Sequence, residues 1–171
     1  MNTTTLCEMT EDRSERGMFM LQLHPLPKGT TGFTSSANSL TILDVKPFIG
    51  LVYSILRGTM EWEDIDLKGK NYFYFSIMSD DQEYHVLLNA YFPYVGISRS
   101  FNNNKFSFMS SEEINNQFII LTECNYVLLG KEELDKELTD TDFLELDNAE
   151  LEQLNYWKPR IVSEIIFNNW D

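Results

Sequence analysis

A run of alternating aromatic residues constrains the fold of this chain most strongly. From Asn71 to Met78 one side of an extended chain carries Phe73, Phe75 and Ile77, and the other carries Tyr72, Tyr74, Ser76 and Met78. This two-residue period predicts a β-strand. Turn residues follow at 79–82, and a second alternating run returns from Glu83 to Tyr91. Because both faces of this pair carry apolar side chains, we expect both faces to be at least partly covered.

The sheet is expected to continue beyond this pair. Pro93 interrupts the ladder of hydrogen bonds and places residues 94–98 at an edge or in a new strand. The segment 101–106, with three successive asparagines between two phenylalanines, resembles a hairpin tip, and a strand follows from Phe106 to Met109. Residues 66–109 therefore predict a β-meander.

Capping residues predict helices on both sides of the meander. The signals are Asp44 before Phe48, Leu51, Val52 and Ile55, with Gly58 as the end; Ser110 and Glu113 before Ile114, Phe118 and Leu121; and Asp147 and Glu150 before Leu154. A strand at 118–122 is the alternative to the second helix, because that run is short and rich in β-formers. A short terminal helix capped by Ser163 is expected to carry Ile165, Ile166 and Trp170.

These elements predict one α+β domain over residues 18–171, with a central antiparallel sheet of four to six strands and helices on one face and at the C-terminus. The length of 171 residues and the apolar fraction of 43% suit one domain with a real core. Residues 1–17 read as a mobile leader and 18–24 as a strand. The loop 25–38 is long for a compact domain, which indicates that it is mobile or functional.

Acidic charge is concentrated near the C-terminal end. The chain has a net charge of −14, and the stretch from Lys131 to Glu152 holds ten acids and two lysines, a net charge of −8. So few scattered bases argue against DNA or RNA as a ligand. A surface this one-sided steers positively charged partners. The residues predicted to bind such a partner are Glu132, Glu133, Asp135, Glu137, Asp140, Asp142, Glu145 and Asp147.

A solvated helical face is the simpler reading of this acidic stretch, although a merely solubilising surface is expected to mix signs and spread its charge. Its spacing superficially resembles a calcium loop. The match fails because Leu144 and Glu145 occupy the fifth and sixth places counted from Asp140, where a calcium loop needs an oxygen ligand and a glycine. We therefore predict no metal site, and no motif in the chain indicates a cofactor.

Catalytic signals are weak. The two histidines, His24 and His85, form no metal-binding cluster, and His85 is expected to be a satisfied core or rim histidine. Cys124 in an apolar segment is expected to be a buried, inert thiol, with a nucleophile served by His85 as the alternative. Two cysteines make a disulfide framework improbable and favour a reduced cytosol. The longest apolar run, 48–56, is too short to cross a membrane, and the leader lacks the apolar core of a signal sequence.

The aromatic end of the chain has two interpretations. Trp157, Phe167 and Trp170 either dock a terminal helix into the core, which ordinary packing favours, or form a recognition surface. The tail 156–159 and 165–171, together with segments 84–89 and 91–94, resembles small acidic proteins of low-GC Gram-positive bacteria that are mostly uncharacterised. In size and acidity the chain is also similar to immunity proteins, which neutralise basic toxin domains in bacterial competition.

This second resemblance implies a cytosolic protein, not an enzyme, that blocks a basic partner such as a toxin nuclease or a similar effector. Two alternatives remain open. One is a small enzyme or ligand-binding domain with His85, Tyr84 and Tyr72 around an aromatic pocket. The other is a phage-type mimic of nucleic acid, which requires carboxylates spaced along one face like phosphates.

Overall fold

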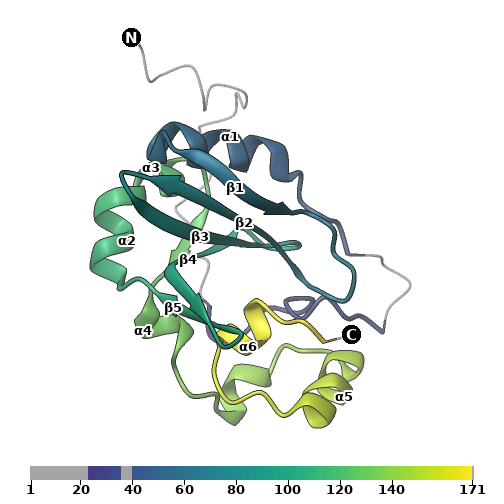
Figure 1. The fold of residues 1–171 in the computed structure, drawn as a ribbon. Coiled ribbons are helices and arrows are strands. Elements are labelled where there is room, and N and C mark those ends of the chain that lie inside the picture. Colours follow the sequence, from purple (N-terminus) through teal and green to yellow (C-terminus); the bar gives the residue numbers. More distant parts are fainter. Residues whose placement is uncertain (1–22, 36–39, 171) are drawn as a thin grey trace, which may run out of the picture.

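A six-stranded sheet forms the centre of the protein (Figure 1). The computed structural model describes residues 23–35 and 40–170. The strands are β1 (Thr59–Asp64), β2 (Tyr72–Ser79), β3 (Gln82–Asn89), β4 (Tyr94–Asn102), β5 (Lys105–Phe108) and β6 (Val127–Leu129). Strands β1 to β5 are antiparallel neighbours in chain order, and β6 pairs in parallel with the first residues of β4. The expected α+β fold with a central sheet is confirmed.

Two tight turns set the register of the meander. Ser79 pairs with Gln82, and the two aspartates between them have φ angles of 49° and 61°. Asn102 pairs with Lys105, and Asn103 and Asn104 have φ angles of 51° and 60°. Two successive left-handed residues match the twist of a β-hairpin, and Asp and Asn adopt this conformation most readily after glycine. The predicted turn at 79–82 and the predicted hairpin at 101–106 are therefore both present.

Helical segments flank the sheet. They are α1 (Val45–Leu56), α2 (Ser111–Phe118), α3 (Ile120–Glu123), α4 (Lys131–Leu134), the 3-10 turn η2 (Asp140–Phe143), α5 (Asn148–Trp157) and α6 (Ser163–Ile166). Asp44 caps α1, and the capping boxes at Ser110 and Asp147 begin α2 and α5 as expected. The alternative strand at 118–122 is absent, because α3 continues the helical path there.

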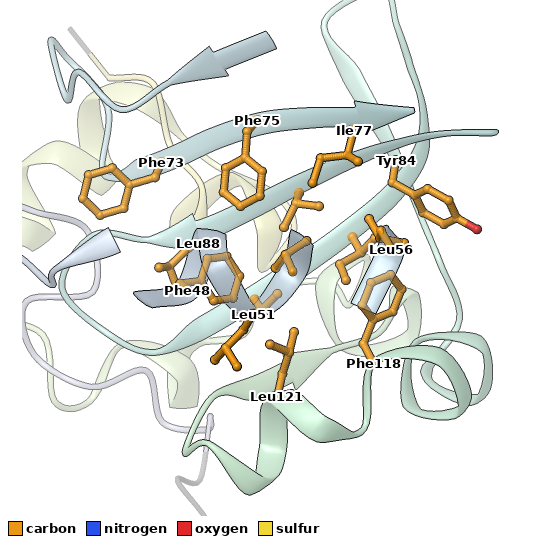
Figure 2. Close-up of a cluster of buried hydrophobic side chains, with 14 of the residues drawn as sticks. Phe48, Leu51, Leu56, Phe73, Phe75, Ile77, Tyr84, Leu88, Phe118 and Leu121 are labelled. Atoms are coloured by element: carbon orange, nitrogen blue, oxygen red, sulfur yellow. The ribbon is translucent and has the colours of Figure 1, made fainter. Parts of the chain in front are cut away.

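One face of the sheet carries the larger core. Phe73, Phe75 and Ile77 of β2 point toward helices α1, α2 and α3, and Phe48 and Phe118 fill the space between them (Figure 2). Phe48, Phe75 and Phe118 are fully buried, and the rings of Phe48 and Phe75 meet edge-on. This face is the apolar side predicted from the alternation in β2.

The opposite face carries a second core, which holds the C-terminal part of the chain. Ile165 and Ile166 of α6 are fully buried there, against Leu87 and Tyr94 of the sheet. Leu26, from the segment before α1, is also fully buried in this core. The expectation that both faces are covered is confirmed. Of the three aromatic residues expected to dock, Phe167 is buried and Trp170 is half-buried against this core, beyond the end of α6, whereas Trp157 is exposed.

Several details differ from the sequence-based expectations. Strands β1 and β6 were not predicted, because β1 has no apolar alternation and β6 has only three residues. Helix α1 ends at Leu56, and Arg57 caps it in a left-handed conformation, one residue before the predicted end at Gly58. Ser163 is the first residue of α6 and makes no cap, since Val162 precedes it with helical angles. The predicted leader 1–17 and most of the predicted strand 18–24 lie outside the described residues, and Leu23 and His24 are not in a strand.

The hydroxyl of Tyr94 generates a stability prediction. Tyr94 is fully buried, and no group of the described residues forms a hydrogen bond with its Oη atom. Burial raises the pKa of this phenol to about 12, with a smaller contribution from the charge of Glu145. Tyr94→Phe should therefore leave the free energy of unfolding unchanged or raise it by up to about 1 kcal/mol in urea denaturation.

Tyr74→Phe is the matched comparison, because the Tyr74 Oη atom lies 2.9 Å from the Nδ1 atom of His85. Removing that bond should lower the free energy of unfolding by about 1 kcal/mol. Equal losses in the two variants would contradict the description of Tyr94.

Candidate protein-binding site

The acidic segment, residues 131–152, divides into inward and outward carboxylates. Asp142 and Glu150 are 1% and 0% exposed, and the Asp147 side chain is 8% exposed. Glu133 is half-buried. The exposed predicted site residues are Glu132, Asp135, Glu137, Asp140 and Glu145. The segment is therefore no uniform charged helix face; α4, η2 and α5 are short helices joined by turns.

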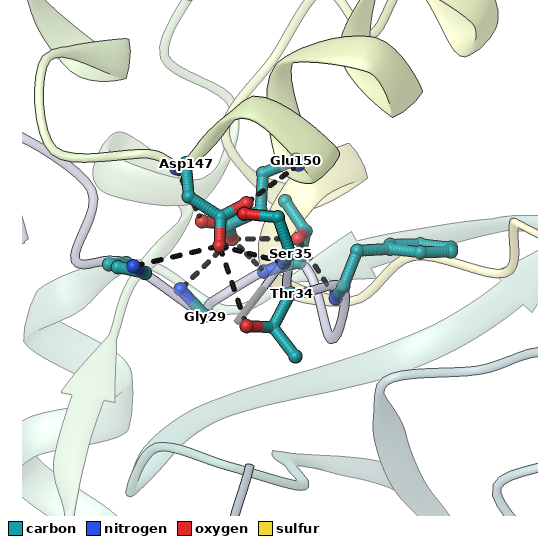
Figure 3. Close-up of polar contacts among 8 residues, drawn as sticks. Gly29, Thr34, Ser35, Asp147 and Glu150 are labelled. Atoms are coloured by element: carbon teal, nitrogen blue, oxygen red, sulfur yellow. Dashed lines mark hydrogen bonds and ion pairs between the residues drawn. The ribbon is translucent and has the colours of Figure 1, made fainter. Parts of the chain in front are cut away.

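Glu150 is a buried carboxylate held by backbone and hydroxyl donors (Figure 3). Its Oε1 atom accepts hydrogen bonds from the backbone N–H of Gly29 at 3.0 Å, the N–H of Thr31 at 3.3 Å and the Thr31 hydroxyl at 2.7 Å. Its Oε2 atom accepts from the N–H of Asp147 at 3.1 Å. Gly29 has a φ of 91°, which turns its N–H toward the carboxylate at a conformation that favours glycine. The segment 29–31 thus forms an anion-binding nest for Glu150.

Asp147 fastens the next part of the same loop. One carboxylate oxygen caps α5 by accepting from the N–H of Glu150 at 3.1 Å, and the other accepts from the N–H of Ser35 at 3.0 Å (Figure 3). The Nζ atom of Lys28 lies 3.7 Å from this second oxygen. Asp147 and Glu150 together bind residues 28–35 to the first turn of α5.

Asp142 makes the third connection. Its Oδ2 atom accepts from the N–H of Thr139 at 2.7 Å and from the Thr139 hydroxyl at 2.9 Å. Its Oδ1 atom lies 2.5 Å from the Nδ1 atom of His24 and 3.7 Å from the Nζ atom of Lys136. The carbonyl of Asp142 also accepts from the N–H of Leu26 at 2.9 Å. These contacts hold the start of the described chain against η2.

Hydrogen bonding governs the ionisation of these two aspartates. Burial acts to raise the pKa of Asp142, but the two bonds from Thr139 and the contact with His24 outweigh it, so the pKa lies below its ordinary value. Burial likewise opposes ionisation of Asp147, and the bonds from Ser35 and the N–H of Glu150, with the charge of Lys28, hold its pKa below the usual range. Both groups are therefore more stable as carboxylates in the folded protein than in the unfolded chain.

An asparagine cluster secures the other side of the loop. The side-chain amide of Asn71 donates to the carbonyls of Thr30 at 2.8 Å and Ile165 at 2.9 Å. Asn89 donates to the carbonyls of Thr30 and of Ile166. Asn168 donates to the carbonyl of Thr31 at 2.8 Å. The three asparagines are 0–3% exposed, so the loop, the sheet and the chain end share one buried polar network.

The exposed Glu132 and the half-buried Glu133 also have partners within the protein. Glu132 accepts from the N–H and hydroxyl of Ser111, and these bonds lower the pKa of its carboxyl. Glu133 accepts from the N–H of Gly130 at 2.8 Å, and its Oε2 atom lies 3.0 Å from the same Ser111 hydroxyl oxygen. Both residues therefore join α4 to the start of α2.

The remaining four predicted residues face solvent. Asp135, Glu137, Asp140 and Glu145 are exposed, and their carboxylates make no ion pair or side-chain hydrogen bond within 23–35 and 40–170. We call this set the acidic face. The structure thus keeps half of the eight predicted residues in an outward arrangement and gives the other half internal partners. Glu150, which the sequence indicated only as part of a capping box, is a further acid with internal partners and is fully buried.

The residues of the alternative pocket are not brought together. His85 and Tyr72 lie on the face of the sheet that carries the second core, whereas Tyr84 packs on Phe118 in the first core. Burial lowers the pKa of His85, while Glu83 acts in the opposite direction. The neutral form of this histidine is thereby favoured in its contact with Tyr74. His85 is thus a buried histidine with a hydrogen-bond partner, as expected from the sequence.

Other expected chemistry can be placed as well. In the described part of the chain, no three His, Cys, Asp or Glu side chains are arranged to hold a metal ion. No helix there has the length and apolar character needed to cross a bilayer. Cys124 is half-buried beside the first core and is disulfide-bonded. The expectation of a reduced thiol is therefore wrong, and the cysteines lend no support to a cytosolic setting.

Glu150→Gln tests the nest directly. The substitution places an NH2 group where an oxygen now accepts a hydrogen bond, so one buried donor loses its partner. We expect the free energy of unfolding to fall by roughly 1–3 kcal/mol in urea denaturation. Glu152→Gln is the matched control on the same helix, because Glu152 is exposed, and it should change stability by less than about 0.5 kcal/mol. Similar effects of the two changes would contradict the role of Glu150.

The lowered pKa values of Asp142 and Asp147 predict acid sensitivity. A carboxyl whose pKa is lower in the folded state contributes stability above its unfolded pKa of about 3.9, and this contribution is lost as the pH falls through the folded pKa. Stability should therefore fall steeply with acidification below about pH 5. Asp142→Asn and Asp147→Asn should each flatten this dependence in denaturation curves collected across the acidic range. An unchanged pH dependence in both variants would be inconsistent with these contacts.

No protein-family model, curated protein or solved structure matches this chain. The candidate site therefore rests on the burial, contacts and charges of its own residues. The resemblance to small acidic proteins and to immunity proteins remains a prediction.

Proposed function

We propose that this protein binds a positively charged protein through the acidic face formed by Asp135, Glu137, Asp140 and Glu145. The observation that carries the proposal is that these four carboxylates are exposed and unpaired among the described residues. Carboxylates left without cations in a chain of net charge −14 raise the cost of self-repulsion. A basic partner would relieve that cost.

The acids next to this face in the sequence have internal partners, and these contacts hold the backbone that carries the face. Asp142 and Asp147 flank Glu145 in sequence, and both are anchored to the loop 23–35. Glu137 pairs through its backbone with Ile161 in an isolated β-bridge. Because the backbone is held on both sides, little ordering entropy is lost when a partner docks. The acidic face is thus a preorganised surface on short, anchored turns.

The partner class that fits best is a basic toxin or effector domain, such as a nuclease with a cationic active site. Carboxylates over such a site would exclude its polyanionic substrate and speed association by electrostatic steering. An immunity role in the cytosol follows as part of the proposal. It requires that binding persist when the disulfide at Cys124 is reduced.

Charge removal tests the proposal. The protein is used to capture its partner from the source cells, and the affinity of the purified pair is measured at two salt concentrations with and without a reductant. The variant D135N/E137Q/D140N/E145Q should weaken binding at least about tenfold, mainly through slower association, and reduce the salt dependence.

The control variant E61Q/E63Q/D80N/D81N removes four exposed carboxylates from β1 and the β2–β3 turn, toward the other end of the molecule (Figure 1). It changes the net charge equally and should leave the affinity within about twofold of the wild type. If both variants lost the same affinity, binding would depend on the total charge of the protein and not on the acidic face. No loss in the first variant would refute the proposal.

A further inference from the structure

A second exposed surface of opposite character lies at the end of α5. The rings of Phe33, Trp170, Trp157 and Tyr156 form a chain of contacts, with centroid distances of 6.3, 6.4 and 5.1 Å between successive rings. Tyr156 is 76% exposed and Trp157 is 39% exposed. We call these four residues the aromatic patch. Single exposed apolar residues are normal on a protein, but a contiguous group of large rings marks an interaction site.

Three separate parts of the chain build this patch. Helix α5 ends at Trp157, and Lys158 reverses the chain in a left-handed conformation with φ 51° and ψ 55°. The loop held by Glu150 contributes Phe33, and the segment after α6 contributes Trp170. The planes of the two tryptophans are within 8° of parallel. The fold therefore gathers rings that are distant in sequence onto one surface.

A hollow of about 340 Å³ lies beside the rings, with Trp157, Pro159, Arg160, Glu164, Asn169 and Trp170 among its lining residues. Lys158 also lines it, and both Lys158 and Arg160 are exposed with no ion pair within the described residues. Among the described residues of the wall, Glu164 carries the one carboxylate, and it already accepts a hydrogen bond from the N–H of Arg160 at 2.6 Å. Two cations and one acid therefore line this hollow within 23–35 and 40–170, in a chain of net charge −14.

We infer that the aromatic patch and its hollow bind an acidic peptide segment that carries an aromatic side chain. Tryptophan, tyrosine and arginine are the residues that most often dominate the energy of protein interfaces. Lys158 and Arg160 complement carboxylates of the ligand, while Trp157 and Trp170 offer ring faces for its aromatic side chain. This site is independent of the acidic face, because its charge preference is the opposite.

Stacking rings beside cations also suit single-stranded nucleic acid. A nucleic acid, however, brings one charge per phosphate along its whole length, and the net charge of −14 repels a long polyanion. A peptide with two carboxylates places its charge only at the patch. A peptide is therefore the favoured ligand, and an oligonucleotide serves as a competing probe.

The test uses the full chain labelled with nitrogen-15, in which three tryptophans give separate indole N–H signals. The probe is the blocked pentapeptide Gly-Asp-Phe-Glu-Gly, compared with its Asn/Gln and Lys/Lys counterparts and with a short single-stranded oligothymidylate. The acidic peptide should shift the Trp157 and Trp170 signals in a saturable manner. Trp62, which is 61% exposed on β1, is the internal control for unspecific ring contact and should not shift.

Variant K158N/R160Q should weaken peptide binding by about fivefold or more, since asparagine tolerates the left-handed conformation of Lys158. Variant K105Q/K131Q, which removes two exposed lysines around another hollow, is the matched control and should bind normally. Trp62 and the remaining signals report whether each variant is folded. The inference is overturned if no peptide shifts Trp157 and Trp170, if Trp62 shifts equally, if the uncharged or lysine peptide binds as well, or if the oligonucleotide binds more tightly.

Discussion

The buried carboxylate of Glu150 is the interaction on which the arrangement of this protein depends most. A charge removed from water is costly unless hydrogen bonds replace its hydration. Here the backbone of Gly29 and Thr31, the Thr31 hydroxyl and the N–H of Asp147 supply those bonds. No cation is among these partners, so the nest at 29–31 has to be in place for Glu150 to be buried. The conformation of the loop and the position of α5 are therefore coupled.

This coupling extends through the loop to the sheet. The carbonyls of Thr30 and Thr31 face away from Glu150 and accept from Asn71, Asn89 and Asn168. The same loop buries Leu26 in the second core and carries Phe33 to the aromatic patch. A segment of about a dozen residues thus connects β2, β3, α5 and the chain end. The sequence predicts that the loop 25–38 is mobile or functional. In the structure, residues 26, 30 and 31 of this loop are buried, and the carbonyls of Thr30 and Thr31 bind the asparagine cluster.

The proposed binding surface depends on the contrast between buried and exposed acids. The carboxylates of Asp142 and Asp147 are buried and bind groups inside the molecule, whereas the four carboxylates of the acidic face point to solvent. In the sequence the displayed acids lie between anchored ones, so the anchored acids fix the turns on which the displayed ones lie. The aromatic patch depends on the same anchoring, because Phe33 and Trp157 lie on the two segments that Glu150 joins. The acidic face and the aromatic patch, which prefer ligands of opposite charge, thus both depend on the contacts between the acidic segment and the loop 23–35.

The sequence predicted the elements in which local signals agree with packing. The alternation in β2, the paired aspartates and asparagines of the turns, and the capping boxes of α2 and α5 all specify their structure within a few residues. Strand β1 carried no such signal, because most of its side chains are exposed. The burial of Asp142, Asp147 and Glu150 could not be predicted from the residues next to them in the sequence. Their partners lie more than 100 residues away, and an acid that reaches such a partner looks the same in sequence as one that faces water.

Hydrogen exchange of the loop amides measures the central claim most directly. If the nest around Glu150 locks the loop to α5, the amides of Gly29 and Thr31 should exchange only through large openings. Their exchange rates should then match those of Tyr91 and Phe92, whose amides bond to Asn89 within the polar network. In Glu150→Gln the loop amides should exchange much faster while those of the first core keep their protection. Exchange of Gly29 and Thr31 at the rate of an unstructured peptide in the wild-type protein would contradict the account.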